Sequence, residues 1–262
     1  MTGATRSASP ATDRAPHMNG IKAFLGRGAL AGIAGGVTAA LYQWIVTEDQ
    51  IRIALEIEAA HSTGHGDEMF SRGTQVIGGM LAAGLYGTFL GLIFGFTCAV
   101  LWRSLPGRTA FARSSRMALV AFVAWVLVPA LKYPANPPSV GDPDTVGQRT
   151  TSYLALLALS LFFAYMAWTL WSRLTDRGLE GAPRFAAVAG AYLAAITVAY
   201  VVFPANPDPL DAPANLIWHF RVDSLAGNAL LWLVMGTAFG YLGDRVPRRQ
   251  ASPAPADDHV SV

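Results

Sequence analysis

The sequence predicts an all-α, polytopic membrane protein with six transmembrane helices. Hydrophobic residues make up 53% of the 262 residues and charged residues 14%, whereas a soluble domain carries about 25% charged residues. The mean hydropathy is +0.37. The hydrophobic residues are gathered into blocks, and little sequence between the blocks is left for a large soluble domain.

Each block is close to the roughly 20 residues that a helix needs to cross a hydrocarbon layer of about 30 Å. Helices are expected because backbone groups in lipid must be satisfied within the segment, and the alternation of barrel strands is absent. The predicted spans are Phe24 to Val46, Thr74 to Trp102, Met117 to Leu131, Tyr153 to Trp171, Phe185 to Phe203 and Leu225 to Leu242. Residues 21–246 therefore form a membrane domain between two predicted disordered tails, 1–20 and 247–262.

The basic residues predict the orientation of the spans in the cell (inner) membrane. Of the 19 Lys and Arg residues, the ones on one side of the six blocks are Arg52, Arg72, Lys132, Arg149 and Arg221, and all the others lie on the opposite side. Cytoplasmic loops carry the excess of Lys and Arg. Both termini are therefore predicted to be cytoplasmic, and the outer side carries most of the acidic residues.

Small residues at every fourth position predict how two spans pack. Gly28, Gly32 and Gly36 line one stripe of the first span, and a second stripe of Gly and Ala runs from Gly79 to Gly95. Such stripes let helix backbones approach closely in lipid. Helix packing explains them sufficiently, and a substrate path along these thin walls is the alternative.

An internal repeat organises the rest of the membrane domain. The string PANP ends the third span at Pro134 to Pro137 and recurs 70 residues later, at Pro204 to Pro207, after the fifth. Each copy precedes an Asp- and Pro-rich outer loop that ends in an arginine, Arg149 or Arg221. The chain is therefore predicted to form three helical hairpins. The PANP strings either end the spans, since proline lacks an N–H and asparagine favours turns, or form an entry vestibule for a cation.

The first outer loop is a candidate metal site. Glu48, Arg52 and Glu56 share one helical face, which predicts a short surface helix. Beyond it the loop holds imidazole and carboxylate groups, a donor set that suits cobalt, nickel or zinc. The candidate ligands are Glu58, His61, His65, Asp67 and Glu68. A solvated connector is the alternative interpretation.

Other chemistry is sparse in the sequence. Cys98 is the single cysteine, so no disulfide forms within one chain. His219 precedes the last predicted span and is expected to be an interfacial residue beside Trp218. The sequence contains no phosphate loop and no nucleophile elbow, so neither an enzyme nor a nucleic-acid-binding protein is expected.

The strings LKYPANPPSVGDPDTVGQRT, from Leu131 to Thr150, and LIWHFRVDSL, from Leu216 to Leu225, resemble the CbtA family of predicted cobalt transporter subunits. The family is usually described with about five spans, and six are predicted here. The resemblance implies cobalt uptake together with CbtB, a small one-span partner. The transported ion would be Co²⁺, and no resident cofactor is expected.

The leading hypothesis is a membrane subunit that takes up cobalt. In this hypothesis the ligands of the first outer loop capture the ion, and Arg149 and Arg221 brace the outer loops. The residues that guide the ion near the outer mouth, beside Lys132, are Asn136, Asp142, Asp144 and Asn206. A membrane scaffold or accessory subunit that transports nothing is the alternative, since few polar residues are expected inside the spans. A homo-oligomer is also considered.

Overall fold

The computed structural model describes residues 18–61, 71–138, 140–206 and 212–245, and all regular structure in this part of the chain is helical. Six helices are long and apolar enough to cross a membrane, which confirms the predicted fold class. In chain order, the elements that form these six are α1 (Met18–Tyr42) with its extensions, α3 (Arg72–Leu101), α4 (Ala110–Phe122) with its extensions, α6 (Val146–Asp176), α7 (Gly181–Val202) and α8 (Ala214–Asp244).

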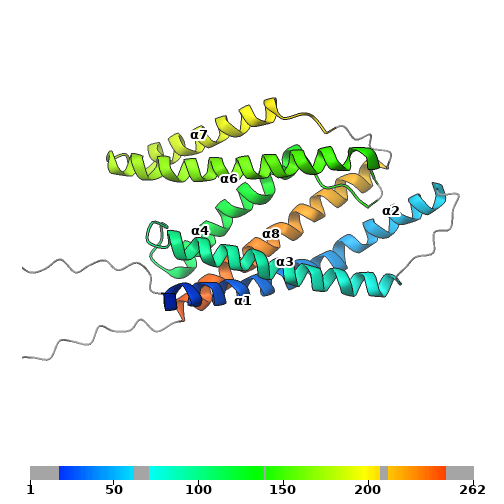
Figure 1. The fold of residues 1–262 in the computed structure, drawn as a ribbon, viewed down its shortest axis with the longest axis horizontal. Helices are drawn as coiled ribbons and strands as arrows, with labels where there is room; N and C mark the ends of the chain where they lie inside the picture. The colour runs from blue at the N-terminus through cyan, green and yellow to red at the C-terminus, as the bar shows by residue number, and fades with distance from the viewer. Residues whose placement is uncertain (1–17, 62–70, 139, 207–211, 246–262) are drawn as a thin grey trace, which may run out of the picture.

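The first span is interrupted by a π-helical turn, η1 (Gln43–Thr47), and continues as α2 (Glu48–His61). Figure 1 shows α2 turning away from the axis of α1. The candidate span Gly20–Ile57 has 38 residues, about 57 Å at 1.5 Å per residue. That is nearly twice the thickness of the hydrocarbon layer, so α2 extends beyond it. The predicted helix in this loop is therefore present, and Arg52 forms an ion pair with Asp49 (3.4 Å), one turn away.

The third span is also interrupted by a π-helical turn. A π-helical turn, η2 (Val123–Leu127), joins α4 to the short helix α5 (Val128–Lys132). Pro129 lies just after the turn. Because proline has no N–H and its ring displaces the carbonyl four residues before it, Pro129 accounts for the wider turn over Trp125.

The last span begins earlier in the structure than the sequence predicts. The sequence predicts the span from Leu225, whereas α8 begins at Ala214. His219, Arg221 and Asp223 are therefore helical, although the predicted outer loop extends to Arg221. The helix continues through them because its backbone groups form hydrogen bonds within the helix. Two of these side chains also bind protein partners, which are described below.

The helices form a tight group and a peripheral pair. The most extensive contacts join α1 to α3, α4 to α8 and α1 to α8, and α7 packs mainly on α6. Figure 1 shows α6 and α7 side by side along one edge of the bundle. Of the three predicted hairpins, the first packs closely as α1 against α3, and the second through α5 and α6, whereas in the third α8 packs in the centre rather than on its chain neighbour α7.

Close backbone contact holds α1 against α3. A Cβ added to Gly32 would lie 2.1 Å from the carbonyl oxygen of Gly87, and one added to Gly91 would lie 2.1 Å from the carbonyl oxygen of Gly28. Only glycine fits there. The stripes predicted from the sequence are thus a helix-packing surface in the structure.

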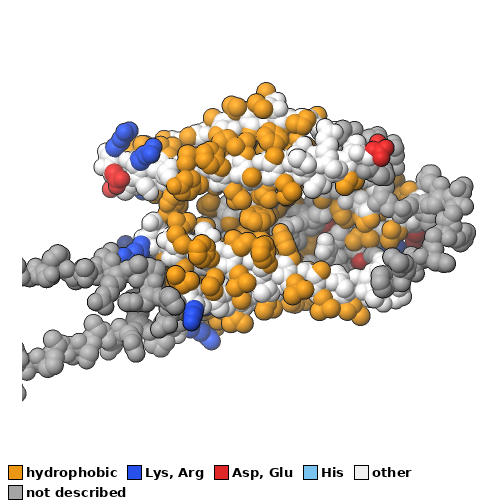
Figure 2. Space-filling model, in the orientation of Figure 1, with side chains coloured by type: hydrophobic (Ala, Val, Ile, Leu, Met, Phe, Trp, Pro, Cys, Tyr) orange, Lys and Arg blue, Asp and Glu red, His pale blue; other side chains and the backbone are white. Residues whose placement is uncertain are grey.

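The core lies where α8 meets α1 and α3. Phe94 and Phe239 pack edge to face with ring centroids 5.4 Å apart, and Met235 is fully buried beside them. Elsewhere hydrophobic side chains point outward and form a band across the middle of the molecule (Figure 2). Lys and Arg gather at the end of the molecule where α1 begins. A hydrophobic band between polar ends is the surface that a lipid bilayer covers.

Candidate functional site

The ends of α5 and α7, which carry the two PANP strings, are tied together at the end of the bundle remote from Met18. The Lys132 ammonium donates to the carbonyl of Tyr200 (2.9 Å), and the Tyr133 hydroxyl donates to the carbonyl of Pro204 (2.7 Å). The Tyr200 hydroxyl in turn donates to the carbonyl of Val128. The two strings therefore lie next to each other. The side chains of Lys132 and Tyr133 thus link the two repeats by hydrogen bonds.

The first PANP string is also held by α8. The Arg221 guanidinium donates to the side-chain oxygen of Asn136 (2.8 Å) and to the carbonyl of Ala135 (3.3 Å). The amide oxygen of Asn136 is thus engaged by a cation. This contact favours a positioning role for Asn136 over direct ligation of a second cation.

The entry to α6 is built around Asp142. Its carboxylate accepts the backbone N–H of Asp144 (2.9 Å), and its carbonyl accepts the Thr145 hydroxyl (2.8 Å). This is a local turn that starts a helix. Asp144 is exposed and Arg149 is half-buried in the first turns of the helix. Asn206, in the second PANP string, is also half-buried.

The candidate metal ligands of the first outer loop are divided by the limit of the described residues. Glu58 and His61 lie in the last turn of α2, whereas His65, Asp67 and Glu68 lie outside the described residues. His219 is exposed on α8. Within the ranges that the structure describes, no three His, Cys, Asp or Glu side chains gather closely enough to hold a metal ion. The predicted capture loop therefore remains a prediction.

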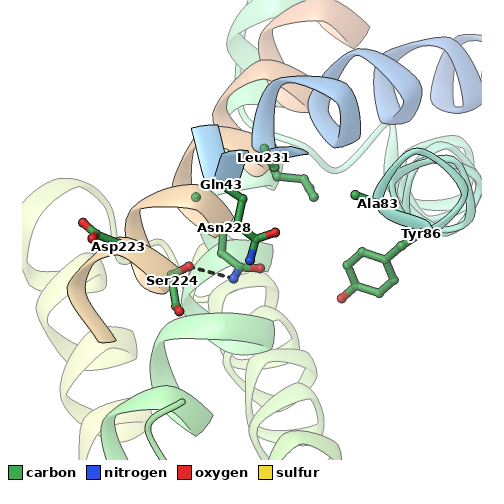
Figure 3. Close-up of a pocket in the computed structure, with 9 residues that line it drawn as sticks. Gln43, Ala83, Tyr86, Asp223, Ser224, Asn228 and Leu231 are labelled. Carbon is green, nitrogen blue, oxygen red and sulfur yellow. Dashed lines mark hydrogen bonds between the residues drawn. The ribbon is translucent and has the colours of Figure 1, made fainter. Parts of the chain in front are cut away.

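A polar pocket lies between α1, α3 and α8 (Figure 3). Its volume is about 150 Å³. Four apolar positions and five polar side chains line it, and the polar ones are Gln43, Tyr86, Asp223, Ser224 and Asn228. Asn228 lies midway along the 31 residues of α8, so the pocket lies about halfway along that helix, and it opens beside Gln43 and Tyr86, whose side chains are exposed.

The elements around the pocket explain how it forms. The close contact between α1 and α3 ends where Gly36 meets Ala83, and Ala83 also lines the pocket. Beyond that point α1 enters the π-helical turn that begins at Gln43. Inserted turns of this kind occur often at functional sites. The helices therefore diverge beside a turn that places an amide side chain at the opening.

Hydrogen bonds fix two of the lining side chains. The Asn228 amide nitrogen donates to the carbonyl of Ser224 (2.9 Å; Figure 3), which orients the side chain so that its oxygen remains as the acceptor. The Tyr42 hydroxyl donates to the Asp223 carboxylate (3.4 Å). In Figure 3 Asp223 lies at the rim, turned away from Asn228. The pocket thus combines neutral oxygen groups inside with one carboxylate at its edge.

Most of this site was not predicted from the sequence. Tyr86 and Asn228 lie inside predicted spans, and Asp223 lies between Arg221, where the predicted outer loop ends, and the predicted span from Leu225. Few polar groups were expected inside the membrane domain. That expectation was wrong for this region. The available signal was a serine and an asparagine one helical turn apart, Ser224 and Asn228, beside an acidic residue at the start of an apolar block.

A family model described as "Probable cobalt transporter subunit (CbtA)" matches residues 21–244. This range includes every described span and both PANP strings. No curated protein and no solved structure matches the chain.

Proposed function

Because the chain belongs to the family of probable cobalt transporter subunits (CbtA), we propose that it is the membrane subunit that carries cobalt from the outer side to the cytoplasm. The observation that carries the proposal is the family match over nearly the whole membrane domain. The polar pocket inside the bundle supports transport over a scaffold role. A scaffold needs no polar cavity at membrane depth, where polar groups are costly.

The proposed orientation of the protein in the membrane rests on charge. The start of α1 and the end of α8 lie at the same end of the bundle, where a Cβ on Gly243 would lie 3.0 Å from the Arg27 guanidinium. The basic side chains gather at the same end in Figure 2. By the positive-inside rule this end is cytoplasmic, and the PANP strings face outward.

Capture of the ion is assigned to the first outer loop. The ligands are Glu58, His61, His65, Asp67 and Glu68. Imidazole and carboxylate groups suit borderline divalent ions. Calorimetry of the purified protein with Co²⁺, beside a His61→Ala/His65→Ala double variant, tests this step. Tight binding that the double variant loses is expected, and equal binding by both would contradict it.

A one-span partner of the CbtB kind is proposed to pack on α7. This helix packs mainly on α6 and exposes Ala186, Gly190 and Ala194 at intervals of four residues. Small residues at this spacing favour helix association in lipid. The variant Gly190→Leu should lose co-purification of the partner, and Gly84→Leu, at another open glycine, should retain it. Two differently tagged copies of the chain, co-expressed, test whether the same face binds a second copy.

Uptake of labelled cobalt tests the function itself. Cells that lack the protein and its partner are grown under cobalt limitation, and accumulation of labelled cobalt is compared with that of cells in which both are restored. A deficit that the restored pair repairs is expected. Normal accumulation without them, together with stable association with a larger assembly, would favour the scaffold role.

A further inference from the structure

The pocket lies between α1, α3 and α8. Apart from amide nitrogens, the polar side-chain atoms that line it are oxygens. The lining includes Gln43 and Tyr86 at the opening and Ser224 and Asn228 deeper along α8, and no Lys or Arg is among the lining residues. The one charge at the pocket is the carboxylate of Asp223. An anion would be repelled there, and a cation would be attracted.

We propose that this pocket binds a partly hydrated divalent cation, with the side-chain oxygens of Gln43, Ser224 and Asn228 facing the ion or its water and Asp223 supplying the charge at the rim. The proposal rests on the proposed function and deepens it, because it places a binding site on the transport path inside the membrane. It differs from the capture loop in both residues and chemistry.

The position of the polar groups argues against a purely structural pocket. At the edge of the pocket, where Gly36 meets Ala83, a Cβ added to Gly36 would lie 2.5 Å from the Ala83 carbonyl oxygen, so α1 and α3 pack there without a cavity. Leucine at Gln43 or Asn228 would cost less in lipid than an amide. The amides, the hydroxyls and the π-helical turn instead converge on one cavity.

The size and the donors of the pocket predict the state of the ion. A cavity needs about 10–15 Å³ of probe-occupied volume to hold one water molecule, so a cavity of about 150 Å³ has room for an ion together with several water molecules. Carbonyl, hydroxyl and carboxylate oxygens suit hard divalent cations such as Mn²⁺ and Mg²⁺, which keep water ligands. The ion therefore retains part of its hydration shell here. Selection of cobalt over manganese is expected at the imidazole-bearing loop and not in the pocket.

Two pairs of variants test the site in the purified full-length protein. Asn228→Leu is matched by Asn215→Leu, an exposed asparagine at the start of the same helix. Gln43→Leu is matched by Gln148→Leu, an exposed glutamine on α6. Asp223→Asn removes the rim charge at constant size. Binding of Mn²⁺ in detergent is followed by the loss of its free-ion electron paramagnetic resonance signal, and binding of Co²⁺ is followed by calorimetry.

The expected result is at least tenfold weaker Mn²⁺ binding for Asn228→Leu, Gln43→Leu and Asp223→Asn, and unchanged binding for both controls. Because Gln43 lies at the opening and is exposed, its variant remains informative even if the change at Asn228 impairs folding. Mn²⁺ binding equal to wild type in Gln43→Leu and Asp223→Asn would overturn the proposal. If cells import cobalt normally with these variants, the pocket fails while the transport function stands, whereas a wild-type protein that imports no cobalt refutes the function itself.

Discussion

Replacing Gly91 by alanine should separate the two most closely packed helices. The new Cβ would lie 2.1 Å from the carbonyl oxygen of Gly28 and 2.8 Å from the Cα of Gly32, and ordinary contacts begin near 3.4 Å. The shortfall of about 1.3 Å falls on backbone atoms, which have no rotamer to change. The helices must therefore move apart by about 1 Å. A gap of that size forfeits roughly a quarter to a half of each dispersion contact along the seam.

The magnitude follows from two opposing effects. Overpacking of a well-packed site costs about 1–3 kcal/mol, and backbone against backbone belongs at the upper end, about 3 kcal/mol. Alanine returns about 1 kcal/mol of helix propensity relative to glycine. The free energy of unfolding should therefore fall by about 2 kcal/mol.

The matched control is Gly84→Ala on the same helix, where an added Cβ meets nothing within 4 Å. Only the propensity effect remains there, so this variant should be as stable as wild type or gain up to about 1 kcal/mol. Both variants are purified in one detergent, and unfolding is followed by circular dichroism on heating. The reasoning would be refuted if Gly91→Ala unfolded at the same temperature as Gly84→Ala.

Three further outcomes are expected. Asp244→Ala removes the carboxylate that accepts two backbone N–H groups in the first turn of α4 (2.8 and 3.0 Å), and it should cost about 1–2 kcal/mol in thermal unfolding, as lost helix caps do. Tyr133→Phe removes the donor to the second PANP string and should cost about 1 kcal/mol, with no effect on Mn²⁺ binding, since Tyr133 is not among the residues that line the pocket. In a Cys98→Ala background, Ser224→Cys should react with a positively charged thiol reagent in membranes because it lines the pocket, whereas Leu233→Cys, on an exposed face of the same helix, should not. A Ser224→Cys that reacts no faster than a non-reacting Leu233→Cys would show that the pocket is closed to water.

How much of the fold the sequence predicts depends on the distance over which each signal acts. Hydrophobicity is summed over about 20 residues, so the six spans and the glycine stripes were predicted. The start of α8 was not. The charges of Arg221 and Asp223 would exclude a membrane helix only if these side chains faced lipid. In the structure Arg221 binds Asn136 and Asp223 binds Tyr42, so the helix continues through both residues.

The candidate site shows the same limit more sharply. Gln43, Tyr86 and Asn228 come from three helices, and no spacing within one segment brings them together. Their convergence depends on the π-helical turn at Gln43 and on the packing of α8 against α1, which is a property of the tertiary structure. A local motif is readable from sequence, whereas a pocket assembled between helices requires their packing.

One helix connects the outer mouth to the pocket, and this connection bears on how an ion would pass. Arg221 holds the first PANP string, and Asn228 lies seven residues further along α8, about 10 Å at 1.5 Å per residue. Asp223, between them, is bound to Tyr42 at the end of α1. A movement of the PANP strings that displaced Arg221 would therefore shift the same rigid helix that lines the pocket. Because α8 also packs on α4 at its other end, where Gly240 meets Phe111, the two sides of the proposed transport path share one structural element.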